Sequence, residues 1–391
     1  MHTRALLVIA GSALVVLGLA AGPLGCSFGT TYRGFSISSP TDRTGVERSR
    51  TEEGTIDPAL VRVIVDNKFG TVDIEATDGP GSWRWELKCW AKDAASAEDW
   101  CDRIALVDEV DSRQGTWRLK VPDGRKKGLS GFQSNLTLRV PRGVAVQVDN
   151  GFGPTRVEGV RGDTVVKAQH GSLKLTELGG RVEASNSFGT MEVVGIAQGT
   201  LKNKHGRLTV RRVAGDLEAS TSYGLLDVQG IDGRLIARNQ HGKIVANDVA
   251  KGASIETSFG TLEATDVTGA ATFKNRHGAI VAKSIAGPVD ATTSFGKIAL
   301  SCSGERVTCH NRHGAVELDL SSERLDRVDV ETSFGSLRVA LPAITDPNID
   351  AKTSFGKVKS DWPVSSRGAT AVELRNSHGG IWVKRKDDET M

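Results

Sequence analysis

The stretch GTLEATDVTGAATFKNRHGAIVAKSIAGPVDATTSFG, residues 260–296, contains two copies of one pattern. In each copy apolar residues alternate with polar ones on both sides of a turn that contains glycine. The first copy has Leu262, Ala264, Val267, Gly269, Ala271 and Phe273 at these positions, and the second has Ile280, Ala282, Ile285, Gly287, Val289 and Ala291. Alternation with period two predicts β-strands, so each copy is predicted to be two short strands joined by glycine turns.

The same unit repeats along the chain at a nearly constant interval. The marker glycines are Gly153, Gly171, Gly189, Gly206, Gly224, Gly242, Gly260, Gly278, Gly296 and Gly314, with steps of 18 residues and a single step of 17. Gly335, Gly356 and Gly379 continue the series with steps of 21, 21 and 23. A fixed period of this length is typical of proteins built from stacked repeats.

A unit of this size cannot bury its apolar face alone, but stacking pairs its strands with those of the next unit. The sequence therefore predicts an all-β fold, a single-stranded β-solenoid with about 18-residue coils over residues 151–385. Proline would interrupt such strand pairing, and between residues 155 and 341 only Pro288 occurs, beside a turn glycine. The competing architecture is a series of antiparallel hairpins, as in a propeller or a sandwich; the constant repeat length favours the solenoid.

An aromatic residue precedes most of the marker glycines, and its type alternates between coils. Phenylalanine or tyrosine and histidine take turns at Phe188, His205, Tyr223, His241, Phe259, His277, Phe295 and His313. We interpret these residues as a structural stack at one corner of the coil, with each ring pointing inward or capping the corner. Histidines two coils apart would lie roughly 9.6 Å apart, too far to share a metal ion. A residue repeated in near-identical surroundings also argues against a single catalytic centre.

A smaller set of basic residues stands directly before the histidines. Lys204, Arg276 and Arg312 occupy this position, where strand alternation predicts an outward side chain. They form a candidate ligand stripe that could bind acidic glycans. The net charge of the 391 residues is only +3, which gives no case for nucleic acid, and the sequence indicates neither a metal nor another cofactor.

The N-terminal residues 1–25 have the features of a secretory signal: Arg4, an apolar run and small residues before Cys26. The stretch GPLGC, residues 22–26, resembles the lipobox of bacterial lipoproteins, with Pro23 departing from the usual leucine. This resemblance implies cleavage before Cys26, lipidation of its sulfur and membrane anchoring in the bacterial cell envelope, on the periplasmic or the surface side. The alternative is an ordinary cleaved signal with an incidental cysteine. Residues 26–55 are polar and are predicted to be a flexible tether.

The four remaining cysteines form two pairs that are close in sequence. For an oxidising compartment we predict the disulfides Cys89–Cys101 and Cys302–Cys309. Buried free thiols are the alternative, and the spacing within each pair does not match that of zinc sites.

Residues 56–150 are predicted to be a β-rich N-terminal cap with one helix at 94–110, where Ala97, Trp100, Ile104 and Val107 are the periodic apolar residues. Five tryptophans, Trp83, Trp85, Trp90, Trp100 and Trp117, lie in this region. They either cover the open end of the solenoid or form a sugar-binding surface. Residues 386–391 are predicted to be a charged tail.

The run NLTLRVPRGVAVQVDNGFGPTRVEGVRGDTVVKAQHGSLKL, residues 135–175, resembles the bacterial putative-adhesin domain family, a repeat-rich domain of unknown function. The resemblance covers about residues 57–385 and is strongest over 136–340. It implies a right-handed parallel β-helix on an exported or membrane-tethered protein, and little chemistry. The strict alternation of phenylalanine and histidine departs from the looser pattern of the family.

These observations favour a non-enzymatic, adhesin-like interaction scaffold anchored in the envelope, with an envelope polysaccharide or a surface protein as its partner. The first alternative is a glycan-binding module that uses the tryptophans or the basic stripe. The second is a polysaccharide-active enzyme, because some carbohydrate lyases and hydrolases are β-helices.

Overall fold

The computed structural model describes residues 45–121, 129–343, 345–363 and 368–386, together with four short strands between residues 6 and 37. These four form two antiparallel hairpins, β1 (Leu6–Ala10) with β2 (Ala13–Leu17) and β3 (Thr30–Tyr32) with β4 (Phe35–Ile37). β1 and β2 fall within the predicted signal segment, and Cys26 lies outside the described residues. In the part of the chain that the structure describes, no helix is long and apolar enough to cross a membrane.

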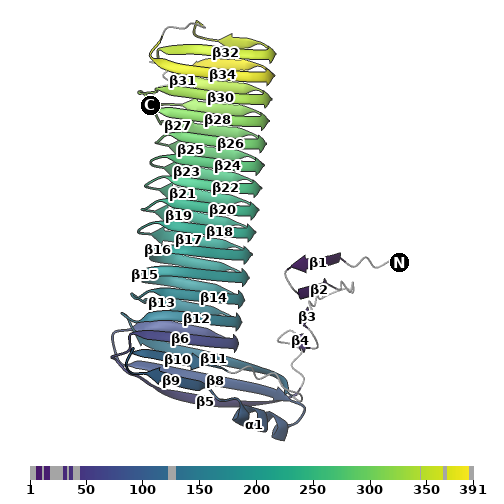
Figure 1. The fold of residues 1–391 in the computed structure, drawn as a ribbon, viewed down its shortest axis with the longest axis vertical. Helices are drawn as coiled ribbons and strands as arrows, with labels where there is room; N and C mark the ends of the chain where they lie inside the picture. Colours follow the sequence, from purple (N-terminus) through teal and green to yellow (C-terminus); the bar gives the residue numbers. More distant parts are fainter. Residues whose placement is uncertain are drawn as a thin grey trace, which may run out of the picture.

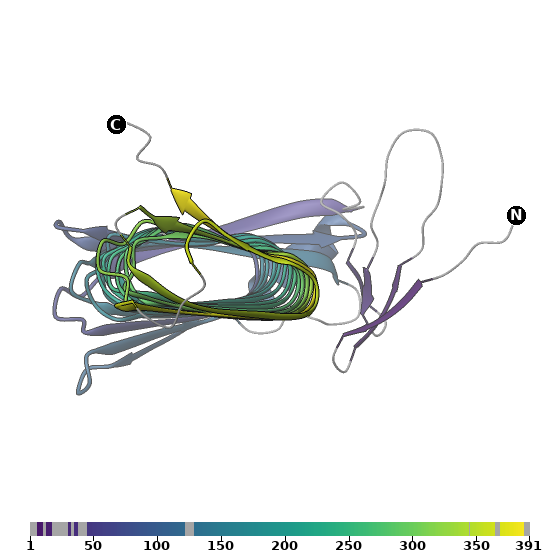
Figure 2. The same ribbon diagram turned by 90° about the horizontal axis from the view of Figure 1, so that it is seen from above.

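The body of the protein is an all-β parallel solenoid in the form of a long rod, as predicted (Figure 1). Seen along the rod, successive coils superpose as a flattened oval (Figure 2). Each coil contributes one strand to each of two broad sheets. We call them the ring sheet, whose strands end at the aromatic residues, and the second sheet.

The ring sheet is formed by the strands that carry the alternating aromatic residues at their ends. In spatial order they are β6 (Arg62–Phe69), β12 (Ala145–Phe152), β14 (Thr164–His170), the second halves of β15 (Leu173–Phe188) and β16 (Met191–His205), β18 (Leu217–Tyr223), β20 (Leu235–His241), β22 (Ala253–Phe259), β24 (Ala271–His277), β26 (Val289–Phe295), β28 (Arg306–His313), β30 (Arg327–Phe334), β34 (Thr370–His378) and β32 (Pro347–Phe355).

The second sheet is formed by the strands that follow the marker glycines. In spatial order they are β7 (Val72–Thr77), β13 (Thr155–Glu158), the first halves of β15 and β16, β17 (Leu208–Val213), β19 (Leu226–Ile231), β21 (Ile244–Val249), β23 (Leu262–Val267), β25 (Ile280–Ile285), β27 (Ile298–Cys302), β29 (Val316–Leu320), β31 (Leu337–Pro342), β35 (Ile381–Lys386) and β33 (Val358–Ser360).

Coils pair in parallel, and equivalent residues lie directly above one another. In the ring sheet His241 pairs with Phe259, and Phe259 with His277. Because side chains alternate across a strand, this register puts every apolar position of the repeat in the interior. The second-sheet column Leu226, Ile244, Leu262, Ile280, Ile298, Val316 and Leu337 is completely buried.

The first coil begins earlier than the repeat in the sequence indicates. β6 and β7 already form one coil, because they pair in parallel with β12 and β13. Residues 78–144 between them are an insertion, so the predicted cap at 56–150 contains part of the solenoid itself. The tether predicted for residues 26–55 is wrong at its C-terminal end. Residues 46–56 form strand β5 (Val46–Ile56), which pairs with β8.

The cap consists of antiparallel strands and one helix. β5, β8 (Gly81–Ala91) and β11 (Leu129–Pro141) form an antiparallel group, and β9 (Val107–Asp111) pairs with β10 (Thr116–Lys120). β10 and β11 also pair in parallel with β6 and β7, so they cover the open edges of the first coil in both sheets. Of the five tryptophans, all but the half-buried Trp83 are buried, so they pack within the cap.

The helix is shorter than the sequence predicts. α1 spans Ala94–Arg103, with Asp93 accepting a hydrogen bond from the backbone N–H of Ser96 as its N-cap. Residues 107–111 form β9 instead of a last helical turn. Valine favours strands, and pairing with β10 satisfies the backbone there, so tertiary contacts override the helical periodicity.

At the distal end the chain order and the spatial order differ. β34 lies between β30 and β32, although it follows β32 in the sequence (Figure 1). The aromatic order in space is therefore Phe334, His378, Phe355. The two successive phenylalanines that seem to break the alternation in the sequence are separated by a histidine in the structure.

The marker glycines make the corner possible. Gly278 has φ +139°, and its N–H donates to the carbonyl oxygen of Phe295 at 2.6 Å. A Cβ at Gly278 would collide with the carbonyl oxygen of Gly260 in the preceding coil. Glycine at this position is thus required both by the backbone angle and by the close approach of adjacent coils.

We predict that Gly278→Ala lowers the stability of the rod by at least about 1–3 kcal/mol, because it combines a strained φ with a backbone collision. Gly131→Ala is the matched control, since an added Cβ there meets no atom within 4 Å and φ is not in the left-handed region. Thermal unfolding followed by circular dichroism would compare the two variants. Equal melting temperatures would contradict this account of the corner.

Candidate functional site

The aromatic residues at the corner form one continuous stack along the rod. We call it the ladder; in spatial order it consists of Phe69, Phe152, His170, Phe188, His205, Tyr223, His241, Phe259, His277, Phe295, His313, Phe334, His378 and Phe355. Neighbouring ring centroids are 4.5–5.1 Å apart, and the ring planes are 1–15° from parallel. Phe132 packs edge-on against Phe69 and closes the proximal end.

The ladder rings lie at the corner and do not point into the core. Phe188, Tyr223, Phe259, Phe295 and Phe334 are 41–47% exposed, and the histidines are half-buried or exposed. Because each ring face is covered by its neighbours, the exposed part of an internal ring is its edge. The predicted corner stack is therefore present, and the part of the prediction that allowed inward rings is wrong. The terminal ring of Phe355 has one stacking partner and is 69% exposed.

A buried row of asparagine and threonine holds the corner from inside. The Nδ2 groups of Asn239, Asn275 and Asn311 donate to the carbonyl oxygens of Gly224, Gly260 and Gly296 at 2.8–2.9 Å. Each bond runs from a histidine coil to the glycine of the preceding coil. The amides thus fix the spacing at which the rings stack.

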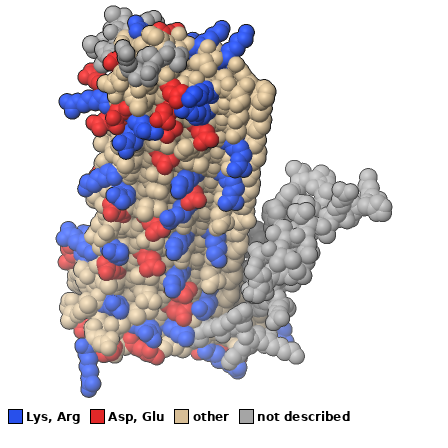
Figure 3. Space-filling model, turned by 45° about the horizontal axis from the view of Figure 1, so that its top comes forward, with Lys and Arg blue, Asp and Glu red and all other residues tan. Residues whose placement is uncertain are grey.

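Unpaired cations lie beside the ladder on the ring sheet. They occupy two outward positions of the histidine coils, one and three residues before the ring, and we call them the basic strip: Lys167, Lys202, Lys204, Lys274, Arg276 and Arg312. All six are exposed, and none has an ion-pair partner among the residues that the structure describes. Figure 3 shows Lys and Arg side chains in rows along the rod, beside a long uncharged edge.

Several other cations of the rod pair with acids of neighbouring coils. Lys243 contacts Glu263 at 2.6 Å, Arg338 contacts Glu317 at 3.2 Å and Lys174 contacts Glu192 at 3.9 Å. One residue before the ring, no such pairing is possible because the intervening coils carry serine. Three residues before the ring, Asp149 lies in register beside Lys167 and Glu256 beside Lys274, but neither forms an ion pair within the described residues. The candidate stripe Lys204, Arg276 and Arg312 is thus exposed as predicted. The second row, Lys167, Lys202 and Lys274, was not predicted, although its constant spacing of three residues before the histidines is visible in the sequence.

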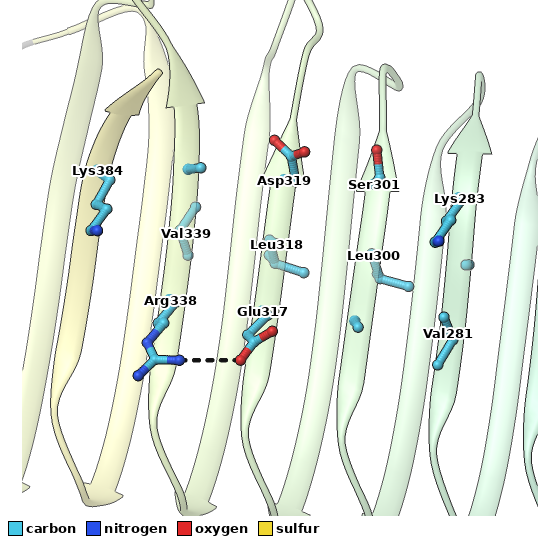
Figure 4. Close-up of a pocket in the computed structure, with 13 residues that line it drawn as sticks. Val281, Lys283, Leu300, Ser301, Glu317, Leu318, Asp319, Arg338, Val339 and Lys384 are labelled. Carbon is cyan, nitrogen blue, oxygen red and sulfur yellow. Dashed lines mark hydrogen bonds and ion pairs between the residues drawn. The ribbon is translucent and has the colours of Figure 1, made fainter. Parts of the chain in front are cut away.

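The surface hollows of the rod offer no comparable arrangement. One hollow of about 390 Å³ lies on the second sheet, over β25, β27, β29 and β31 (Figure 4). Its labelled residues include the small Val281 and Ser301, and the ion pair of Glu317 with Arg338 crosses its rim (Figure 4). A second hollow of about 720 Å³ lies at the opposite narrow edge and contains the Arg212–Glu177 ion pair at 2.7 Å. Cations and carboxylates are mixed at both rims, and neither hollow has an exposed aromatic row beside them.

The cysteines are buried thiols in the structure, and neither predicted disulfide is formed there. Cys89, Cys101, Cys302 and Cys309 are all free. Burial raises the pKa of each thiol, that of Cys302 to about 11, so the thiols remain protonated at neutral pH and are poor nucleophiles. A hydrogen bond between Cys89 and Cys101 shows that these two side chains lie together, and their oxidation to a disulfide stays a prediction.

Groups for metal chemistry or catalysis do not come together in the described ranges. No cluster of three His, Cys, Asp or Glu side chains that could hold a metal ion occurs there. His310 Nδ1 lies 3.6 Å from Glu331, without a nucleophile beside it. Burial raises the pKa of Asp73, and Glu75 and Glu158 add to this rise, whereas Arg156 opposes it.

The comparisons with known proteins give distant structural likeness only. A putative cell adhesion protein from Clostridium sporogenes is 8% identical, with a TM-score of 0.20, over 87% of this chain and 100% of its own. A putative adhesin from Parabacteroides merdae is 8% identical, with a TM-score of 0.27, over 74% and 97%. A putative lipid binding protein from Parabacteroides distasonis is 14% identical, with a TM-score of 0.25, over 74% and 96%. No family model and no curated protein matches the sequence.

We predict that the ladder stabilises the rod through both faces of each internal ring. Phe295 stacks on His277 and His313, whereas Phe355 stacks only on His378. Each lost stack should cost about 0.5–1.5 kcal/mol beyond burial, so Phe295→Ala should lower the melting temperature more than Phe355→Ala. Thermal unfolding of the two variants measures this difference, and an equal or opposite order would show that stacking contributes little.

Proposed function

We propose that this protein is a non-enzymatic interaction scaffold of the bacterial cell envelope, a rod that binds its partner along the ladder edge. The observation that carries the proposal is the coincidence of an exposed, uninterrupted ladder with six unpaired cations beside it. Charged side chains are normally placed where they pair or are solvated, and a row of unpaired cations beside exposed aromatic edges is typical of a binding surface.

The repetition of the site argues for binding and against turnover. An enzyme needs one centre at which a nucleophile or an acid and a base converge. Here every histidine of the ladder has aromatic rings on both faces, and the described cysteines are protonated and buried. Among the described residues, the carboxylates that most resemble a catalytic group are Asp73, Glu75 and Glu158. They lie at outward positions of the second sheet. A polysaccharide-active enzyme is thus the least supported alternative.

A glycan-binding module is the second candidate, and the basic strip favours it. The tryptophans do not support it, because all but Trp83 are buried in the cap and offer no open ring face to a sugar. Sugar binding through the ladder would have to use ring edges, hydroxyl groups and cations, except at the open end formed by Phe355.

We also propose that the rod is tethered by a lipid at Cys26. The support is the signal-like residues 1–25 and the lipobox resemblance of GPLGC. Two or three acyl chains would be enough for stable anchoring.

The anchor is tested by mass spectrometry of the mature N-terminus. We expect cleavage before Cys26 and a mass increase that corresponds to diacylglycerol, with or without a third acyl chain. A mature chain that begins elsewhere, or an unmodified Cys26, would refute the lipid anchor and leave the binding proposal standing.

The binding surface is tested with the full-length protein against immobilised envelope polysaccharides and surface proteins. We expect at least one to bind, and the triple variant Lys204→Gln, Arg276→Gln and Arg312→Gln to weaken binding about tenfold or more at low salt. The matched control removes three cations that the structure shows in ion pairs: Arg156→Gln, Lys174→Gln and Arg338→Gln.

Equal losses in both triple variants would indicate an unspecific effect of net charge and would contradict binding at the ladder edge. Turnover of a glycan that is abolished by Asp73→Asn would replace the scaffold proposal with the enzyme.

A further inference from the structure

We infer that the ladder edge binds a linear anionic polysaccharide, and that protonation of the ladder histidines strengthens this binding in mildly acidic medium. The inference rests on the proposed function, because it names the ligand of the same edge and adds the histidines to its binding groups.

The ladder is suited to hold charged imidazoles. His241 lies between Tyr223 and Phe259, with centroid distances of 4.8 and 4.9 Å and ring planes within 5° of parallel. The faces of aromatic rings attract cations, so an imidazolium between two such faces is stabilised on both sides. A histidine side chain is the group that gains its charge closest to physiological pH. At the proximal end of the ladder burial opposes the charged form, because it lowers the pKa of His170.

The ladder histidines lie in a line along the rod at a regular spacing. Successive histidines are two coils apart, about 9.6 Å at the strand spacing of a sheet. This separation slightly exceeds the screening length of about 8 Å at physiological salt, so the charges act together on a bound polymer mainly at lower salt. The basic strip has the same two-coil period, since its cations belong to the histidine coils. The strip is interrupted at the coil of His241, which carries Gln240 and the ion-paired Arg238, so an anionic polymer would meet two groups of free cations, one up to Lys204 and one from Lys274.

The charged groups around the four central histidines include cations and carboxylates from every neighbouring strand. On the histidine coils these are Lys202, Lys204, Arg207, Arg238, Lys243, Lys274, Arg276, His310 and Arg312. On the intervening ring-sheet strands they are Glu218, Glu256, Asp290, Asp329 and Glu331. Beyond the corner they are Glu192, Asp227, Glu263, Lys297 and Glu317.

Most of these carboxylates already have a cationic partner. Arg238 holds Glu218 at 2.8 Å, and His310 lies near Glu331. Within the described part of this surface, Glu256, Asp290 and Glu183, which lies beside the coil of His205, have no ion-pair partner. A bound polyanion and a protonated imidazole on this edge attract one another. Because such coupling is reciprocal, proton uptake must strengthen polyanion binding.

The shape of the ladder favours a polysaccharide over nucleic acid. Single-stranded nucleic acids stack their bases on open aromatic faces, and the faces of the internal rings are occupied. The edge presents serine hydroxyls beside the aromatic rings, at Ser187, Ser222, Ser258, Ser294 and Ser333. Such groups hydrogen-bond with sugar hydroxyls, while the cations bind the acidic substituents.

The test measures binding of the full-length protein to dextran sulfate, whose charge does not change over the range, and to polygalacturonate, which carries carboxylates. Neutral dextran and single-stranded DNA complete the set of probes. At low salt we expect the affinity for one or both acidic polysaccharides to rise about tenfold or more between about pH 8 and about pH 5.5, and neutral dextran not to bind. Preference for one of the two identifies sulfate or carboxylate as the favoured group.

The variant His205→Tyr, His241→Tyr, His277→Tyr and His313→Tyr keeps the rings and removes the titration, since Tyr223 shows that the ladder accommodates tyrosine. We expect the ratio of its affinities at pH 5.5 and pH 8 to be close to one, in contrast to the native protein. His310→Tyr is the control, because it removes an imidazole outside the ladder. Circular dichroism establishes that each variant is folded.

Binding that does not change with pH, or a rise that persists in the four-tyrosine variant, would overturn the role of the histidines and leave the proposed function intact. Equally tight binding of single-stranded DNA would overturn the assignment to polysaccharides. Absence of binding to any acidic polysaccharide at either pH would overturn the inference, whereas a protein partner that still depends on Lys204, Arg276 and Arg312 would preserve the proposed function.

Discussion

Parallel pairing of each coil with the next, in unshifted register, is the constraint on which the rest of this structure depends. It places every residue directly above its equivalent at the spacing of neighbouring strands, about 4.8 Å. Equivalent apolar residues of successive coils form a buried column. The marker glycines form a row of corners at which adjacent coils are in close contact. An aromatic position becomes a stack of rings whether or not the rings attract one another. Each contact between two neighbouring coils is therefore repeated along the rod.

The same constraint provides a physical reason for the alternation of histidine and phenylalanine. With histidine in every coil, charged imidazoles 4.8 Å apart would repel by about 0.9 kcal/mol even in bulk water, and doubling the distance halves this repulsion. With phenylalanine in every coil, like rings would face one another directly, an arrangement that their quadrupoles disfavour. The ladder contains one such pair, Phe69 with Phe152 in the first two coils, whose planes are 9° from parallel. Alternation gives each imidazole two aromatic faces. The insertion of β34 between β30 and β32 preserves this order in space although the sequence does not.

The sequence was sufficient for those features that depend on the repeat alone. The period predicted the solenoid, and the positions of Gly278 and His277 within it predicted a corner stack. It was insufficient where the chain leaves the repeat. The motif NKFG at residues 67–70 matches the corner of the repeat and could have marked the first coil. The paths of residues 78–144 and of β9 could not be predicted locally, because both depend on pairing with distant strands. The outward direction of the rings depends on the shape of the corner, which period-two alternation does not describe at a turn.

The arrangement of charge follows from the two-coil period. An ion pair between neighbouring coils needs opposite charges in adjacent coils, as in Lys243 with Glu263. One residue before the rings, cations alternate with serine instead, so a cation such as Arg276 has no acid above or below it in its own row. Its nearest counterpart in that row is Arg312, another cation, two coils away. The repeat that separates the histidines thus also leaves these cations unpaired, and both effects increase the positive charge along one edge of the rod. A surface built in this way matches a ligand that is itself periodic. The affinity for such a ligand grows with the number of coils that the ligand spans.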